Sequence, residues 1–217
     1  MNNDRKEEIV EALNFTINSG YFDEQESEKI AIEYLEEFYM DNDFPAPSYN
    51  RMKKIINEVG EMRPLDTGQK NYERLQGVFD QLNREGIISI DYAGFDISEG
   101  HEEVGVVFKF MKENDLLRNG YCFYHQQDIE RCMDSENRTL FLAFHSLNGD
   151  EEMALKVGKR IVDLLNQARF EVEWTGSLNQ RIGIKNFYWD KLFNLEPVGS
   201  TRALKIMQQS NEAQGKQ

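Results

Sequence analysis

Two of the three histidines in this chain end apolar, aromatic-rich runs that are typical of β-strands. His125 ends the run YCFYH and is followed at once by Gln127 and Asp128, and His145 ends the run TLFLAFH. An imidazole oriented by a carboxylate is a common general base, and the same groups are acceptable ligands for zinc or iron. These residues therefore indicate a candidate site at the ends of two strands.

The direction of the strands decides whether these groups can meet. In an open parallel sheet, ligands bind outside the carboxyl ends of the strands. Asp128 and its neighbours also begin a helix after the second strand, where free backbone N–H groups favour an anion. If the sheet is parallel, one edge collects the residues that we expect to contact a ligand, which are Asp91, Tyr124, Gln127, His145 and Trp174.

Three interpretations of this cluster compete. A metal site would use His125, His145 and either Asp91 or Asp128, but the chain lacks HExxH and CxxC spacing, and we expect neither metal nor cofactor. A catalytic site would use His125 as a general base oriented by a carboxylate. A structural role would have Asp128 accept hydrogen bonds at the helix start, which alone explains the residue types.

The pattern of apolar residues predicts an α/β fold from residue 71 onward. Strand and helix patterns alternate there, which favours a small mixed, mostly parallel sheet flanked by helices. The last two strands are close enough to form a hairpin, which gives the sheet a final antiparallel edge strand. The predicted strands are residues 87–91, 121–125, 139–145, 170–174 and 181–187.

An acidic segment of three helices precedes this sheet. Residues 1–62 contain 15 acidic and 6 basic residues and hold −9 of the net charge of −14. We expect a helical N-terminal segment over 1–65 that ends in the linker RPLDTG at 63–68, an α/β domain over 66–196, and a C-terminal helix with a frayed tail over 197–217. The apolar stripes of the three helices are Ile9, Leu13 and Ile17; Ile30, Tyr34, Leu35 and Phe38; and Met52, Ile55, Ile56 and Val59.

Composition limits the partners. A hydrophobic fraction of 40% is that of a globular chain, and 39 acidic against 25 basic residues disfavour nucleic acid and anionic membranes. The polar start MNNDRKEEIV has no apolar signal core, and no run approaches the roughly 18 apolar residues that a membrane span needs. We expect a cytoplasmic protein with no nucleic-acid or membrane partner.

Three runs of residues resemble an uncharacterised bacterial protein family, a domain of unknown function. They are GYCFYHQQDIER at 120–131, TLFLAFHS at 139–146 and VGKRIVDLLNQARFEVEWTGSLNQRI at 157–182, and their most specific parts are GYxFYHxQD and VEWxGxxxxRI. The resemblance supplies no activity, but it draws attention to Arg181. Beside His125 and Asp128, this arginine would suit an anionic small molecule or a carboxylate side chain. Equally, an Arg181–Asp128 ion pair would hold the hairpin to the sheet.

Two functions are compatible with these observations. The first is a non-enzymatic module that binds a protein partner or an anionic small molecule, with the acidic helices as a partner surface. The second is a small-molecule enzyme whose candidate catalytic residues are His125 as general base, Asp128, and Arg181 holding the substrate. The sequence determines neither the choice between them nor the oligomeric state.

Overall fold

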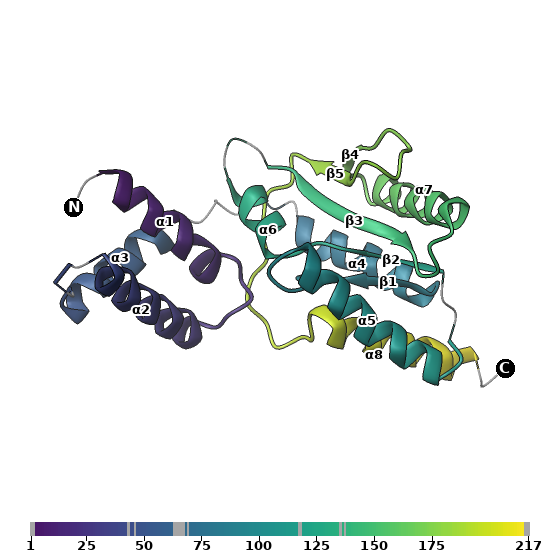
Figure 1. Ribbon diagram of the computed structural model, residues 1–217, viewed down its shortest axis with the longest axis horizontal. Coiled ribbons are helices and arrows are strands. Elements are labelled where there is room, and N and C mark those ends of the chain that lie inside the picture. The colour runs from purple at the N-terminus through teal and green to yellow at the C-terminus, as the bar shows by residue number, and fades with distance from the viewer. Residues whose placement is uncertain are drawn as a thin grey trace. The chain divides into compact units, whose positions relative to one another are not determined.

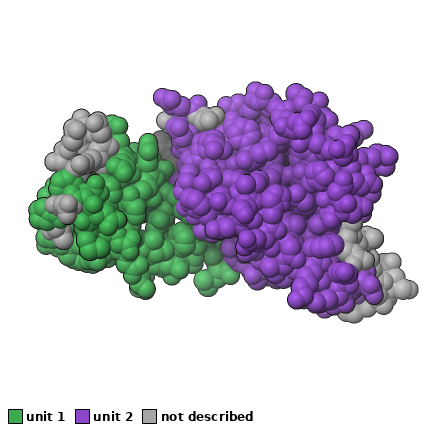
Figure 2. Space-filling model, viewed as in Figure 1, with its two compact units in different colours: residues 1–69, 189–195 green, residues 70–188, 196–217 purple. Residues whose placement is uncertain are grey.

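The chain folds into two compact units. The computed structural model describes residues 3–42, 44–45, 47–62, 68, 70–116, 119–134, 136 and 138–214 (Figure 1). Residues 1–69 and 189–195 form the helical unit, and residues 70–188 and 196–217 form the α/β unit (Figure 2). All of the predicted linker except Gly68 lies outside the described residues, and the domain boundaries placed from the sequence remain a prediction.

The helical unit contains the three predicted helices, α1 (Asn3–Asn18), α2 (Glu24–Asp41) and α3 (Tyr49–Gly60). The side chain of Asp23 caps α2 by accepting a hydrogen bond of 2.7 Å from the backbone N–H of Glu26. Each helix contributes one apolar stripe to a common core, and the exposed acidic residues of α1 and α2 lie outside these stripes. The buried core residues are Ile9, Leu13, Ala31, Leu35, Phe38, Tyr39, Met52, Ile56 and Val59.

A later segment of the chain completes the helical unit. The indole N–H of Trp189 donates to the carbonyl of Ser19 at 2.8 Å, and the buried ammonium of Lys191 donates to the carbonyl of Gly20 at 2.6 Å. Gly20 has a φ of +74°, and a Cβ there would collide with the backbone carbonyl of Lys191. Only glycine therefore fits this turn between α1 and α2.

The α/β unit is a five-stranded sheet with helices on both faces (Figure 1). The strand order is β1-β2-β3-β5-β4, so β4 lies at an edge and β5 lies inside the sheet. Its elements are α4 (Asn71–Arg84), β1 (Ile87–Ile90), α5 (Ile97–Glu113), β2 (Gly120–Phe123), α6 (Gln126–Met133), β3 (Leu140–Ser146), α7 (Glu151–Gln167), β4 (Glu171–Glu173), β5 (Ile182–Lys185) and α8 (Gly199–Gln214).

The alternation of side chains along each strand separates two cores. Ile88, Ile90 and Phe123 belong to a buried apolar cluster that includes residues of α5 and α8. Ser89, between Ile88 and Ile90, points to the other face, which α4 covers. The backbone N–H of Ser89 donates to Oδ1 of Asn83 in α4 at 2.8 Å, and its carbonyl accepts from Nδ2 of Asn83 at 2.9 Å. Both faces of β1 are therefore covered, which explains its uninterrupted burial.

The α/β class is confirmed, with one correction to the strand directions. Among the strands of the described residues, β1 and β2 form the one parallel pair, whereas β2–β3, β3–β5 and β4–β5 are antiparallel. The 17-residue helix α5 is about 26 Å long and can return the chain along the sheet, but the 8-residue helix α6 reaches only about 12 Å. The chain thus enters β3 at the end where it left β2, and β3 runs the opposite way.

Candidate functional site

The carboxyl ends of β1 and β2 lie together, as the parallel pair requires, and the loops that follow them are bonded to each other. The backbone N–H groups of Gln126 and Gln127, at the start of α6, donate to the carbonyls of Gly94 and Phe95 at 3.0 and 3.2 Å. Gln127 and Asp128 were expected to favour an anion through their backbone N–H groups. Both groups are already satisfied, since that of Asp128 donates to the carbonyl of His125 at 3.0 Å, and the start of α6 is held to the β1–α5 loop.

Asp128 is the centre of the polar cluster at this edge. Its side chain has no exposed surface, and Oδ2 accepts from Nη2 of Arg181 at 2.5 Å. The same oxygen lies 3.2 Å from Nε2 and 3.3 Å from the backbone N–H of His125, while Oδ1 lies 3.4 Å from Nη1 of Arg131. The structure therefore brings the three predicted catalytic residues, His125, Asp128 and Arg181, into direct contact.

His125 is neutral in this cluster. Burial lowers the pKa of the imidazole, the positive charges of Arg181 and Arg131 lower it further, and the carboxylates of Asp128 and Asp96 only partly oppose them. With one ring proton, Nε2–H faces the Asp128 carboxylate. Nδ1 is then the unprotonated nitrogen, and it is buried with no hydrogen-bond partner among the described residues.

Arg181 connects this buried cluster to an open recess. Its side chain is 33% exposed, and Nη2 also donates to the carbonyl of Phe141 at 2.9 Å. Its Nε is buried and has no hydrogen-bond partner in the part of the chain that the structure describes. The recess has a volume of about 210 Å³ and is lined by residues of α5, β2, β3 and the β4–β5 loop, namely Ile97, His101, Tyr121, Ala143, Phe144, Leu178, Asn179, Gln180 and Arg181.

Asp91 and Tyr124, two other residues that were expected to contact a ligand, are buried inside the α/β unit. Asp91 is buried, and its carboxylate accepts from the hydroxyl of Tyr72 at 2.7 Å and from the backbone N–H of Gly199 at 2.8 Å. Burial raises the pKa of Asp91, and these two hydrogen bonds oppose the rise. Tyr124 is almost fully buried, with its ring 5.7 Å from that of Phe79. Gln127 lies at the start of α6 and is half-buried.

His145 and Trp174 were expected at the same edge as His125, and the structure places them elsewhere. His145 pairs with Tyr121 in the antiparallel ladder, at the start of β2 rather than at its end. Trp174 packs edge-on against Phe144, with ring centroids 5.5 Å apart. The cause is the reversed direction of β3, because β4 runs the same way as β3 and carries Trp174 with it.

The recess includes polar residues that were not among the predicted site residues. His101 is exposed on α5, and its ring lies edge-on to those of Tyr121 and Phe123 at 5.5 and 5.3 Å. Asn179 and Gln180 come from the β4–β5 loop. The spacing of Ile97 and His101, four residues apart on one helix face, is the sequence signal that could have included His101.

Two negative findings apply to the described part of the chain. Its His, Cys, Asp and Glu side chains nowhere gather in groups of three or more that could hold a metal ion. None of its helices is both long enough and apolar enough to pass through a membrane.

Fold and site together define a mixed α/β protein with a buried His–Asp–Arg cluster beside an open recess. A family model described as a domain of unknown function (DUF6891) matches residues 2–193, and the chain belongs to that family. The predicted membership of a family of unknown function is thereby confirmed. No significant match was found among curated proteins or among solved structures.

Proposed function

We propose that the chain is a non-enzymatic binding module whose α/β unit takes a small anionic ligand, a carboxylate or a phosphate, in the recess beside Arg181. One observation carries this proposal. The guanidinium groups of Arg181 and Arg131 both contact the Asp128 carboxylate, and Arg181, one-third exposed, also lines the open recess. Among the described residues that line the recess, Arg181 is the one charged side chain, in a chain whose net charge is −14.

The geometry of Arg181 supports the same proposal. Its two polar contacts with described residues both use Nη2, so Nη1 can donate to a ligand in the recess. His101 and Asn179 are exposed at the recess and offer further donors. A volume of about 210 Å³ lies below the roughly 300–1,000 Å³ of sites for drug-sized ligands, which favours a small anion.

A second candidate function is a small-molecule enzyme with His125 as general base. The contact between its Nε2 and Asp128, with Nδ1 left unpartnered, favours this alternative. However, His125 is only 3% exposed, and a base must reach the proton that it removes.

We place the module in the cytoplasm, since its two cysteines, Cys122 and Cys132, are both free thiols.

Binding can be tested by NMR titration of the full chain with inorganic phosphate and, separately, with acetate. We expect saturable amide shifts around Gln180 and Arg181. The exposed His101 allows a mild variant without a donor, and His101→Leu should weaken binding by about 3- to 10-fold, the effect of one lost hydrogen bond. His145→Leu, a change of the same type at a histidine that does not line the recess, should leave binding unchanged.

Two results would overturn the proposal: no saturable shift at the recess with either anion, or equal weakening by His101→Leu and His145→Leu. Turnover of a phosphate or carboxylate ester that disappears in His125→Gln would instead favour the enzyme. Because His125 is buried, the folded state of that variant must be checked by its NMR spectrum.

A further inference from the structure

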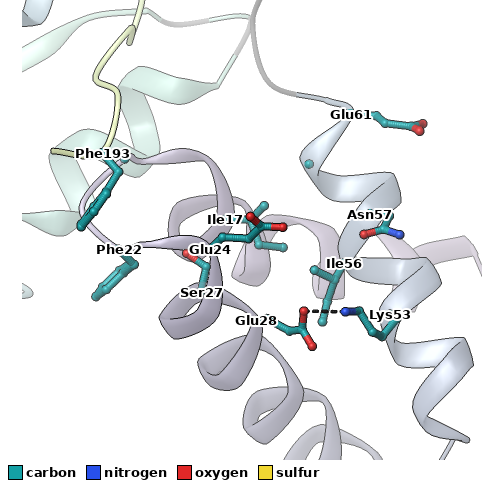
Figure 3. Close-up of a pocket in the computed structure, with 12 residues that line it drawn as sticks. Ile17, Phe22, Glu24, Ser27, Glu28, Lys53, Ile56, Asn57, Glu61 and Phe193 are labelled. Carbon is teal, nitrogen blue, oxygen red and sulfur yellow. Dashed lines mark hydrogen bonds and ion pairs between the residues drawn. The ribbon is translucent and has the colours of Figure 1, made fainter.

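The helical unit contains a pocket of its own, separate from the α/β recess (Figure 3). Its volume is about 580 Å³, within the range of protein binding pockets. All three helices of the unit and the segment around Phe193 contribute to its wall. The apolar side chains that line it are Ile17, Phe22, Ile56 and Phe193.

The polar part of the pocket is acidic. Lys53 and Glu28 form an ion pair of 2.6 Å, drawn as a dashed line in Figure 3, and so largely neutralise each other. This hydrogen bond lowers the pKa of Glu28. Glu24 and Glu61 also line the pocket, are exposed, and have no cationic partner among the described residues. The pocket therefore combines apolar walls with two uncompensated carboxylates.

Exposed apolar side chains extend this surface beyond the pocket. Phe193 is 42% exposed, Leu192 beside it in the chain is 66% exposed, and Met62, which follows Glu61, is 60% exposed. Exposed apolar side chains beside a pocket with polar residues are typical of protein–protein interaction sites. A small molecule in the pocket would leave Leu192 and Met62 exposed, which favours a macromolecular partner.

From these features we infer that the helical unit binds a basic, amphipathic segment of another protein. One apolar side chain of the segment enters the pocket between Ile17 and Ile56, and its lysine or arginine side chains face Glu24 and Glu61. This is the helix-in-groove mode of recognition. A second copy of this chain is disfavoured as the partner, because residues 1–62 of each copy would bring a net charge of −9 to the interface.

The inference can be tested on the full chain with two labelled peptides of one helical pattern. Both carry leucine at i, i+4 and i+7, and the other positions are lysine in one peptide and glutamate in the other. Fluorescence anisotropy should show binding of the lysine peptide alone. The double variant Glu24→Gln/Glu61→Gln, and separately Phe193→Ser, should each weaken that binding by about 10-fold, the size expected for a lost interface anchor or paired charge.

A charge-matched control separates the pocket from the general acidity of the chain. Glu36 and Glu37 are exposed on α2 and do not line the pocket, so Glu36→Gln/Glu37→Gln should leave affinity nearly unchanged. Equal weakening by both double variants would show attraction by net charge alone and would overturn the inference. No binding of the lysine peptide, equal binding of both peptides, or self-association without peptide would also overturn it.

Discussion

Nη2 of Arg181 lies 2.5 Å from Oδ2 of Asp128, a carboxylate with no exposed surface. This ion pair joins the loop before β5 to the first turn of α6. The energetic value of such a pair lies mainly in the cost of breaking it, because a carboxylate removed from water needs its partners. The pair therefore fixes the position of Arg181 at the recess as well as stabilising the fold.

Replacing Arg181 should lower the stability of the folded chain. In Arg181→Met, the side-chain partners that Asp128 keeps among the described residues are Arg131 at 3.4 Å and the neutral His125. We expect a loss of about 2–4 kcal/mol in the free energy of unfolding, below the full value of a buried pair because Arg181 is one-third exposed. Urea denaturation measures the loss. Adding Asp128→Asn should recover part of it, and a loss under about 0.5 kcal/mol would contradict a structural pair.

Acidification should destabilise the α/β unit through His125. Burial lowers the pKa of the folded imidazole below 6.5, so between pH 6.5 and the folded value the unfolded chain binds more protons. Stability should therefore fall as the pH decreases through this window and be unaffected by this group above it. His125→Gln should remove that part of the pH dependence, as measured by unfolding at pH 7 and at pH 5.5. An unchanged slope would mean that His125 titrates normally in the folded state.

Much of the fold was predictable because its signals are local. The apolar stripe of Met52, Ile56 and Val59 forms the buried face of α3, and the strand predicted over 139–145 is β3 within one residue. Strand direction is not a local signal. It depended on whether α6 is long enough to return the chain along the sheet, and α6 has only 8 residues.

The directions of the strands also explain which residues of the site could be placed correctly from the sequence. Asp91 and His125 share an edge because β1 and β2 are parallel, and the Arg181–Asp128 ion pair was one of two alternatives considered for those residues. His145 was assigned to that edge only because β3 was taken to be parallel. His101 was missed because its contribution depends on how α5 packs beside β2, which no residue pattern specifies.

Asp91 should act as a connector of three elements. Its carboxylate joins the end of β1 to Tyr72 of α4 and to the backbone N–H of Gly199, where α8 begins. Asp91→Ala removes the acceptor of the buried Tyr72 hydroxyl and of the partly buried Gly199 N–H, and should lower the free energy of unfolding by about 2–4 kcal/mol. Asp91→Asn keeps an acceptor for Gly199 and should cost less. Unfolding in urea gives both values, and amide exchange should rise first in α8. Equal costs for the two variants would contradict the connector role.

The cysteines should be unreactive in the folded chain. Burial raises the pKa of Cys122 to about 12, and the hydroxyl of Ser89 at 3.3 Å opposes this only in part. Burial also raises the pKa of Cys132. At pH 8 almost no thiolate is present, so iodoacetamide should label neither thiol without unfolding and both in urea. Mass spectrometry measures the labelling. Rapid labelling of either thiol in the folded chain would contradict the prediction.

Gly20→Ala should destabilise the helical unit by more than the strain of a left-handed residue. Gly20 has a φ of +74°, and a methyl group there would collide with the carbonyl of Lys191. Gly176 is the matched control, since its φ is +81° and no atom lies within 4 Å of a Cβ placed there. We expect Gly176→Ala to lower the free energy of unfolding by about 1 kcal/mol from strain alone, and Gly20→Ala to lower it by about 2–4 kcal/mol.

The readout for Gly20→Ala should report on the helical unit itself. Trp189 bonds the carbonyl of Ser19, next to the turn, and in a Trp174→Phe background it is the only tryptophan. Its fluorescence then follows the release of this segment during urea denaturation, while circular dichroism follows both units and gives the value for Gly176→Ala. If the turn tolerates a methyl group, Gly20→Ala and Gly176→Ala should lower the free energy of unfolding by the same amount. A larger loss in Gly20→Ala, with Trp189 released at lower urea, is the result that a close approach of the Lys191 carbonyl requires.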